Sequence, residues 1–479
     1  MKVEIDGGDA TYKSTVVKLL REKFAAIEFR DRGLMTKLTD IHPDQWPVDV
    51  DSAHETNTVY VILEAEISVC LDRIQKRFIE TGVPIDEKYE TYDSLFKYQQ
   101  RFRRLAIKYQ TYFIDTTNKT SVQVVEIIAR ILTPPTAPKV EPLSDRPKAY
   151  HKTKTETILV WHSVGIGKIA IPYDARTPHQ YMLPNPDYVN QDQFNSYPLI
   201  AEGESKIVRQ LNDKFSLIQY KPTIYSHTAQ RAGIIPGSEI ERMTMTRDIL
   251  SILETHAIPH AYWYVGDRYI LCERLRTIAD RENLAQIPPI ETIVKQYYVG
   301  TDAHIYYGLY SQLCNTSAKE EITSLQTLCS QTTPAQRFCA LKYPHPLVRF
   351  DWRNPNKHPL TKTPLGDAVM SDDHANLFIN TKTAKELAKK TFAVLETHFT
   401  NMGIQLQDIC FMITTNGTMH FGEISQDNAR YKKISFDTSQ RDLDKDLWRS
   451  GNSSDLVLQK WRELTKIVHN YTIILWLSA

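Results

Sequence analysis

The sequence predicts two domains of different fold class: an α/β domain in which helices flank a parallel sheet, then an α+β domain with antiparallel sheets. Length is the first observation, because 479 residues exceed the size of one typical domain. The second is that residues 1–132 alternate between strand and helix patterns, and the apolar run at 59–63 is typical of strands buried on both faces of a parallel sheet. The third is a change, after about residue 155, to short strands and hairpins mixed with helices.

A proline-rich segment separates the two predicted domains. Five prolines lie between residues 134 and 147, which favours an extended spacer over a helix. We therefore predict a first domain over residues 1–132, a linker over 133–155 and a second domain over 156–479.

Composition and charge are those of an ordinary globular protein. Hydrophobic residues make up 42% of the chain, and 58 Lys and Arg residues balance 57 Asp and Glu residues. Balanced charge gives no reason to expect a nucleic-acid or membrane partner. Six scattered cysteines without a C-x-x-C pair favour reduced thiols and a cytoplasmic location, and the strand-like start predicts no signal peptide. The apolar run at 471–477 is too short to cross a bilayer and is predicted to be a buried final turn or strand.

The first domain is predicted to consist of strands and helices in alternation. Its strands are expected over 3–5, 59–63 and 112–114, and its helices over 16–24, near 68–79, near 88–109 and near 121–132. In the second domain, strands are expected over 207–208, 215–220, 269–273 and 291–298, helices over 247–256 and 382–399, and a hairpin over 409–421 around Asn416-Gly417.

The segment that follows the first strand, Asp-Gly-Gly-Asp-Ala-Thr-Tyr-Lys-Ser-Thr at 6–15, has most of a phosphate-binding loop pattern. In that pattern, Gly, four residues and Gly-Lys-Ser/Thr, backbone N–H groups cradle phosphates, the lysine reaches the terminal ones and the hydroxyl binds Mg²⁺. Gly7, Lys13 and Ser14 fit, but Tyr12 occupies the position of the second glycine. Either the Tyr12 side chain points outward from a backbone with positive φ, or the phosphate geometry is altered.

Two arginines lie further along the same predicted domain. Arg73 and Arg77 are four residues apart, and they therefore share one face of the predicted helix. Alone, such a face is usually a solvated surface. Together with the loop, it is typical of a lid that brings positive charge to a transferring phosphoryl group.

The order of Gly7-Gly8-Asp9, Asp31-Arg32-Gly33, Leu63-Glu64 and the Arg73/Arg77 helix resembles the thymidylate kinase family, in particular its short, virus-type members. The resemblance covers nearly all of residues 1–132. It implies a P-loop fold, ATP and Mg²⁺ as cofactors and a nucleotide as substrate. It also implies roles for single residues: Lys13 on the β- and γ-phosphates, Ser14 on Mg²⁺, Asp31 and Arg32 on the acceptor side, Arg73 and Arg77 in the lid, and Gly7, Gly8, Asp9 and Thr15 in nucleotide binding.

The second domain carries a collinear set of short blocks, which lie at 201–208, 230–237, 256–260, 290–295, 299–301, 403–408 and 422–430. In this order they resemble SAICAR synthetase, an enzyme with an ATP-grasp-type fold that joins aspartate to a carboxylated ribotide, most clearly over 195–435. The resemblance implies that Gly203, Lys206 and Arg353 bind nucleotide, and that Lys295, Thr301, Asp408 and Arg430 bind the substrate.

The expected metal positions of that family are changed in this chain. Met412 and Gly422 stand where the family has its two metal-binding carboxylates, and a thioether is a poor ligand for Mg²⁺. Glu423 is the remaining candidate metal ligand, although strand alternation points it to the opposite face unless a bulge re-aims it. We therefore expect this half not to run the standard ATP-dependent ligation, and to keep nucleotide or ribotide binding.

These observations leave three hypotheses for function. The leading one is a nucleotide-metabolism enzyme whose first half phosphorylates a (deoxy)nucleoside monophosphate and whose second half binds, and in one version ligates aspartate to, a related nucleotide. The rival is a nucleotide-binding pseudoenzyme that acts as scaffold, sensor or sequestering protein. The third is a structural partner in oligomerisation, in line with an expected homo-oligomer. Residues 151–200 and 302–345 match no pattern on which to argue.

Overall fold

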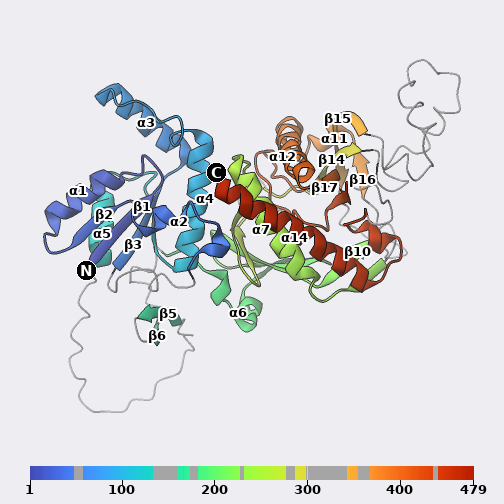
Figure 1. Ribbon diagram of the computed structural model, residues 1–479, viewed down its shortest axis with the longest axis horizontal. Coiled ribbons are helices and arrows are strands. Elements are labelled where there is room, and N and C mark those ends of the chain that lie inside the picture. The colour runs from blue at the N-terminus through green and yellow to red at the C-terminus, as the bar shows by residue number, and fades with distance from the viewer. Residues whose placement is uncertain are drawn as a thin grey trace, which may run out of the picture. The chain divides into compact units, whose positions relative to one another are not determined.

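The computed structural model describes residues 1–47, 58–132, 159–164, 167–172, 182–226, 231–276, 286–297, 299, 342–353, 367–434 and 441–478. The chain divides into two compact units, Met1–Asn185 and Pro186–Ser478 (Figure 1). Each unit has its own sheets and its own hydrophobic core.

Unit 1 (Met1–Asn185) is built on a four-stranded parallel sheet. The strands are β1 (Lys2–Gly7), β2 (Glu28–Asp31), β3 (Thr58–Glu64) and β4 (Tyr112–Asp115), in the order β2-β1-β3-β4. The predicted parallel sheet is thus confirmed. Strand β2 was not predicted, because only Phe29 of its four residues is buried and no apolar run marks it. An antiparallel pair, β5 (Leu159–Val164) and β6 (Gly167–Pro172), also belongs to this unit.

Helices cover both faces of the parallel sheet (Figure 1). Alternation along β3 sends Val61 and Leu63 to a core with α1 (Lys13–Lys23) and α5 (Ser121–Leu132), while Ile62 packs with α2 (Leu34–Leu38) and α4 (Tyr92–Tyr109). Helix α3 (Ile67–Thr81) and the short η1 (Pro43–Gln45) complete the described part of the α/β arrangement. The sheet therefore presents the carboxyl end of β1, where ligands bind in open α/β sheets, to the loop that leads into α1.

Unit 2 (Pro186–Ser478) contains two five-stranded antiparallel sheets, which confirms that the sheets of this half are antiparallel as predicted. One has the order β12-β13-β9-β8-β7, with strands Tyr262–Val265, Ile270–Glu273, Phe215–Tyr220, Lys206–Gln210 and Leu199–Glu202. The other has the order β16-β15-β14-β17-β18, with strands Ala368–Met370, Lys342–Trp352, Ile290–Tyr297, Ile404–Phe411 and Ala429–Lys433. A separate hairpin pairs β10 (Thr223–Ser226) with β11 (Arg231–Ile234).

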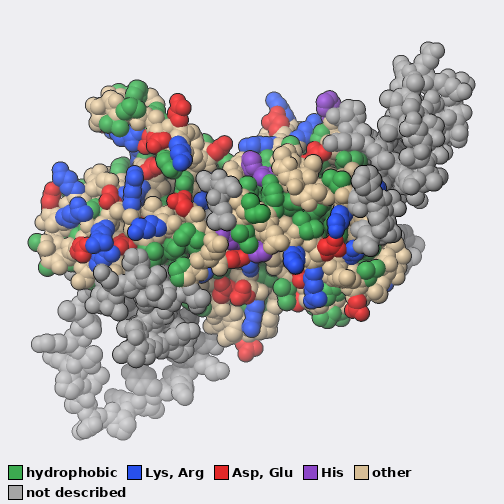
Figure 2. All heavy atoms as spheres, viewed as in Figure 1, with side chains coloured by type: hydrophobic (Ala, Val, Ile, Leu, Met, Phe, Trp, Pro, Cys, Tyr) green, Lys and Arg blue, Asp and Glu red, His purple; other side chains and the backbone are tan. Residues whose placement is uncertain are grey.

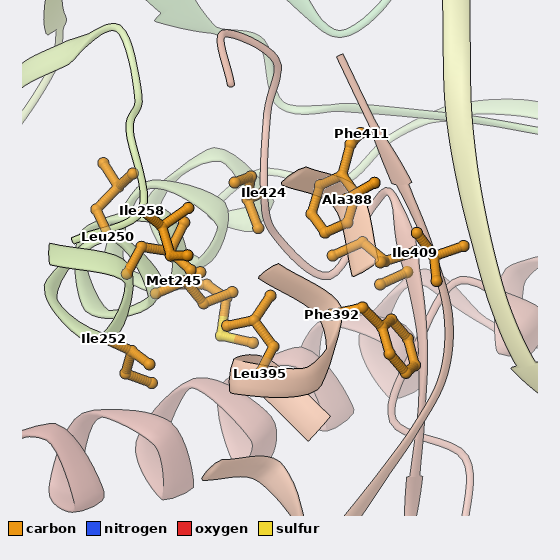
Figure 3. Close-up of a cluster of buried hydrophobic side chains, with 14 of the residues drawn as sticks. Met245, Leu250, Ile252, Ile258, Ala388, Phe392, Leu395, Ile409, Phe411 and Ile424 are labelled. Atoms are coloured by element: carbon orange, nitrogen blue, oxygen red, sulfur yellow. The ribbon is translucent and has the colours of Figure 1, made fainter. Parts of the chain in front are cut away.

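Three long helices pack in the core of unit 2: α7 (Ser238–Thr255), α12 (Thr381–Asn401) and α14 (Ser454–Ser478). Figure 3 shows Met245 of α7 next to Leu395 of α12, with Ile409 of β17 beside Phe392. The shorter helices are η4 (Pro186–Tyr188), α6 (Gln191–Ser196), α11 (Asp372–Ala375) and α13 (Asp446–Arg449).

Some expected elements differ from the observed ones, among them the hairpin around Asn416-Gly417, whose two arms pair as strands only at an isolated bridge between Ile413 and His420. Helix α7 begins nine residues earlier than the predicted start at 247. The prediction missed its first half because that half buries polar residues such as Arg242 and Thr246 and lacks apolar periodicity. The run at 471–477 is neither a separate turn nor a strand but the end of α14. No helix in the described ranges is long and apolar enough to cross a membrane.

Charge is evenly distributed on the surface in view. Figure 2 shows Lys and Arg side chains interspersed with Asp and Glu side chains, in agreement with the net charge of +1.

A pair of histidines, the buried His398 and the half-buried His256, makes the stability of unit 2 depend on pH. His398 lies 2.8 Å from Nε2 of His256 and 2.9 Å from the Tyr471 hydroxyl. Burial, and then His256, lower the pKa of His398 from 6.5 to about 4. Since the folded-state pKa is depressed, this contribution to stability is fully present above pH 6.5 and is lost as pH falls towards 4.

We expect His398→Gln, which keeps hydrogen-bonding capacity without the titration, to flatten the decline of unfolding free energy over this window. The wild-type slope from this group should approach about 1.4 kcal/mol per pH unit. Urea unfolding at several pH values between 7 and 4 measures it, with the exposed His374→Gln as control. An unchanged slope in His398→Gln would contradict the assignment.

Candidate functional site

The main cleft of unit 1 has a volume of about 840 Å³ and lies over the loop between β1 and α1. Loop residues 7–10 and 12–15 line it on one side, and α3 contributes Arg73, Lys76 and Arg77. Asp40, Tyr98 and Phe102 line it from the segment after α2 and from α4. The cleft thus combines a loop of glycine and polar residues with cationic and aromatic side chains.

Backbone groups of the loop are arranged as an anion site. Gly7 has a φ of +139°, and the backbone N–H groups of Gly8 through Tyr12 donate no hydrogen bond within the described residues. The Thr11 hydroxyl donates to the Gly8 carbonyl at 2.8 Å, which closes the loop on itself. Donors left unpaired at the start of a helix are suited to phosphate oxygens.

Lys13 is the buried cation of the loop. Its side chain is 8% exposed, and its Nζ donates to the Gly8 carbonyl at 2.5 Å and lies 3.8 Å from Asp9. Burial lowers the pKa of Lys13, and the charge of Asp9 opposes that shift. A desolvated ammonium held by a carbonyl gains from an incoming polyanion, so the lysine is placed to take up phosphate charge.

Two adjacent glycines of the loop differ in how much space surrounds them. A Cβ on Gly7 would lie 2.1 Å from the Leu63 carbonyl oxygen, whereas a Cβ on Gly8 meets nothing within 4 Å. We expect Gly7→Ala to destabilise unit 1 by at least about 2 kcal/mol and Gly8→Ala to change it by less than about 1 kcal/mol. Thermal and urea unfolding of the two variants compares them directly, and equal effects would show that the backbone yields at Gly7.

Oxygen atoms suited to Mg²⁺ lie at the start of α1. The Ser14 hydroxyl donates to a carboxylate oxygen of Asp31 at 2.9 Å, and both side chains reach solvent. A hydroxyl beside a carboxylate suits a hard cation, so Ser14 and Asp31 fit the magnesium ion that the resemblance implies. Arg32, with a φ of +56° and a side chain 71% exposed, lies 3.8 Å from Asp9 at the same edge.

Tyr12 adopts the left-handed conformation that its glycine-like position demands, with φ +72° and ψ +9°. Such a conformation costs a non-glycine residue about 1–3 kcal/mol. Its ring lies under the Arg73 guanidinium, 3.9 Å from centroid to Cζ. The positive φ of the first sequence alternative is observed, and the Tyr12 ring lies against Arg73 at the cleft.

The two arginines predicted as lid residues have different partners. Arg73 donates to the carbonyl oxygens of Ala10 at 3.1 Å and Thr116 at 2.7 Å, so it lies against the loop. Arg77 forms two hydrogen bonds with the Glu90 carboxylate, at 2.6 and 2.7 Å. Both guanidinium groups line the cleft, yet neither is a free cation.

In unit 2, the predicted nucleotide residues lie on the first sheet and at the edge of the second. Gly203 is in the exposed turn between β7 and β8, where its N–H donates to the Lys206 carbonyl at 3.0 Å. Burial lowers the pKa of the half-buried Lys206, and Glu423 opposes the shift. Arg353 follows β15 and lies 3.6 Å from Glu291 with its side chain 57% exposed.

Glu423, the candidate metal ligand, faces a buried arginine. The Arg242 guanidinium donates to both carboxylate oxygens at 2.7 Å, and the Ser425 hydroxyl donates to one of them at 2.5 Å. Burial raises the pKa of Glu423, but the charge and hydrogen bonds of Arg242 together hold it below its usual range. Glu423 could therefore hold a metal ion only if this ion pair opened.

The two altered metal positions are in contact with each other. A Cβ on Gly422 would lie 2.3 and 2.4 Å from Cγ and Cβ of Met412, so the thioether side chain fills the space above the glycine. Within the described ranges, no three His, Cys, Asp or Glu side chains are grouped to hold a metal ion. The residues present in this part of unit 2 do not fit the Mg²⁺ of the SAICAR synthetase family.

Three predicted substrate residues form one buried ion-pair cluster. Asp408 of β17 accepts from Arg430 of β18 at 2.6 Å and from Lys295 of β14 at 3.2 Å. Burial raises the pKa of Asp408, yet Arg430 and Lys295 together lower it below its usual range. Adjacent strands thus bring together residues 113 positions apart in the chain. Thr301, the fourth predicted member, lies outside the described residues.

Comparison with known proteins shows to which family unit 2 is similar. A family model described as SAICAR synthetase matches residues 199–466. Because this match takes in more than half of the chain, the protein belongs to the SAICAR synthetase family. The resemblance predicted for the second half is confirmed, while the match does not include unit 1, whose likeness to thymidylate kinases remains a hypothesis.

Individual relatives extend the comparison. Bifunctional cordycepin biosynthesis cluster protein 3 of Cordyceps militaris is 26% identical over 563 aligned residues, which cover 98% of this chain and 60% of that protein. The chain therefore spans less than two thirds of that relative's length. Phosphoribosylaminoimidazole-succinocarboxamide synthase of Trichodesmium erythraeum is 26% identical over 270 residues, covering 53% of this chain and 91% of that one. The solved structure of the same enzyme from Ehrlichia chaffeensis is 20% identical and covers 57% of this chain and 98% of its own, with a TM-score of 0.41.

Proposed function

We propose that the protein is a nucleotide-metabolism enzyme with two nucleotide sites: unit 1 phosphorylates a (deoxy)nucleoside monophosphate from ATP, and unit 2 binds a nucleotide or ribotide. One observation carries the first part: the loop N–H groups, which have no partner among the described residues, and the buried Lys13 face a cleft of about 840 Å³. A second supports the pairing of functions, because the fungal relative described as bifunctional matches 98% of the chain.

In the proposed reaction, an oxygen of the acceptor monophosphate attacks the γ-phosphorus of ATP. The bond from that phosphorus to its bridging oxygen breaks, which leaves ADP and a nucleoside diphosphate. Loop N–H groups and Lys13 hold the donor phosphates, and Arg32 is the exposed cation next to the acceptor side. Mg²⁺, held by Ser14 and Asp31, would neutralise phosphate charge when bound.

The far side of the same cleft suits an acceptor nucleoside. Tyr98 of α4 offers an aromatic face, with the buried Phe102 behind it, and the Tyr98 hydroxyl donates to the Asp40 carboxylate at 3.3 Å. A base can stack on such side chains while the sugar and phosphate reach towards the loop.

For unit 2, family membership supports binding of a nucleotide and of a ribotide-like substrate. Lys295, Asp408 and Arg430 form a desolvated ion-pair cluster, and charges of this kind suit a polar substrate. The family's reaction is the ligation of aspartate. For this reaction the chain lacks two carboxylates that would hold Mg²⁺, because Met412 and Gly422 occupy their positions.

The test is ATP consumption with Mg²⁺ against a panel of nucleoside and deoxynucleoside monophosphates, with and without aspartate, with mass spectra of the products. A diphosphate product supports the kinase and names its base, and an aspartyl adduct shows that unit 2 ligates. If ATP is not consumed with any acceptor, the proposal of an enzyme is wrong.

The pseudoenzyme is the second candidate, and two observations favour it: the Met412–Gly422 contact and the closed Arg242–Glu423 pair. Its signature is saturable nucleotide binding by calorimetry that is equally tight in Mg²⁺ and in chelator, without turnover. Binding that weakens strongly in chelator would reject it.

A further inference from the structure

Arg73 is held against the phosphate-binding loop by contacts that involve both ends and one face of its guanidinium. Nη1 donates to the Ala10 carbonyl at 3.1 Å and to the Thr116 hydroxyl at 3.3 Å. Nη2 donates to the Thr116 carbonyl at 2.7 Å. The face of the group lies 3.9 Å from the centroid of the Tyr12 ring. The side chain therefore joins the loop to the segment after β4.

The same contacts act on the two strained residues of the loop. Ala10 and Tyr12 both have positive φ, at 59° and 72°, although neither is glycine. Arg73 contacts the carbonyl of the first and the ring of the second. The Tyr12 carbonyl in turn accepts from the Val16 N–H at 2.8 Å, which begins the hydrogen bonding of α1. Conformations of this kind persist only where the surroundings fix them.

We propose that the Tyr12–Arg73 stack replaces the missing glycine of the loop, and that Arg73 is a positioning residue that keeps the loop in its phosphate-cradling conformation. In this role Arg73 stays on Ala10, Tyr12 and Thr116 and does not move onto the transferring phosphoryl group. The inference rests on the nucleotide-binding role proposed for the loop, and it reassigns one of the two arginines predicted to form a lid.

The first experiment needs no nucleotide. Amide hydrogen exchange of Val16, whose N–H bonds the Tyr12 carbonyl, should be about tenfold faster in Arg73→Lys of the full chain, because a lysine ammonium has no planar face to stack on the Tyr12 ring. Tyr12→Leu should have the same effect, whereas Tyr12→Phe keeps the aromatic face and most of the protection. Gln75→Ala, an exposed residue of α3 outside the cleft lining, is the matched control.

The second experiment separates positioning from direct contact with the phosphoryl group. Calorimetry with ATP and Mg²⁺ should show a Kd about tenfold higher in Arg73→Ala, with KM for ATP rising in parallel and kcat less affected. In a Tyr12→Gly background, where the loop has its usual glycine, the same substitution should raise Kd by only about twofold.

Two results would overturn the inference. One is unchanged exchange of the Val16 amide in both Arg73→Lys and Tyr12→Leu. The other is a loss of kcat in Arg73→Ala that is equally large in the wild-type and Tyr12→Gly backgrounds while Kd stays constant, which is the behaviour of a lid residue. If wild-type protein binds no nucleotide, the proposed function fails, while the exchange data still decide whether the stack orders the loop.

Discussion

Lys13→Ala should reduce ATP-dependent phosphorylation by about 10³-fold or more. Lys13 is the buried cation of the loop, and its Nζ now bonds the Gly8 carbonyl, from which it can swing to the phosphates. Charge that develops on a transferring phosphoryl group is stabilised mainly by such positioned cations, and one of them is commonly worth that factor. Removing it should lower kcat more than it weakens nucleotide binding.

Initial rates with the preferred acceptor, at saturating ATP, measure the effect. Lys18→Ala is the matched control, because Lys18 lies on the same helix, is exposed and does not line the cleft. Activity of Lys13→Ala within tenfold of wild type would place phosphoryl transfer elsewhere in the protein. Thermal unfolding of both variants separates a catalytic effect from a loss of folded protein.

Arg242→Ala should destabilise unit 2 by about 3–5 kcal/mol, because it leaves the Glu423 carboxylate buried without its ion partner. Arg242 is fully buried, bonds both oxygens of Glu423, and also donates to the Lys221 carbonyl at 3.1 Å. Its guanidinium lies 4.6 Å from the centroid of the Tyr220 ring. A buried charge that loses its partner must be protonated or exposed, and either route favours the unfolded state.

Urea unfolding followed by circular dichroism tests this expectation. The double variant Arg242→Met with Glu423→Leu should recover most of the lost stability, since replacing both members of a buried pair by apolar groups is often neutral. Glu202→Gln, which breaks the exposed Lys221–Glu202 pair, should leave the midpoint unchanged. A small effect of Arg242→Ala would mean that water reaches Glu423 in the folded protein.

The elements that sequence analysis predicted well are those with a continuous or periodic apolar pattern. The run at 59–63 became β3, and the apolar spacing at 382–399 became α12. Strand β2 and the first half of α7 were missed because edge position and buried polar residues remove that pattern. Tertiary contacts determine the secondary structure of these two segments, and a local sequence pattern does not report such contacts.

The same limit applies to the candidate sites. Lys13 and Ser14 could be found because a loop motif is local in sequence, and Asp408 and Arg430 because the family resemblance is collinear. Arg242 was missed, since its partner Glu423 is 181 residues away and no spacing rule connects them. Likewise, the spacing of Arg73 and Arg77 predicted a shared helix face but not their separate partners.

The contact between Met412 and Gly422 also restricts how this protein could change in evolution. An aspartate introduced at 422 would place its Cβ 2.3 Å from Met412, so that single substitution is disfavoured by overlap. A glutamate introduced at 412 would stand alone above a glycine, a carboxylate with no second acidic ligand beside it at 422. The first substitution alone is hindered by overlap and the second alone provides a single carboxylate, so a carboxylate pair at these positions requires two coupled substitutions.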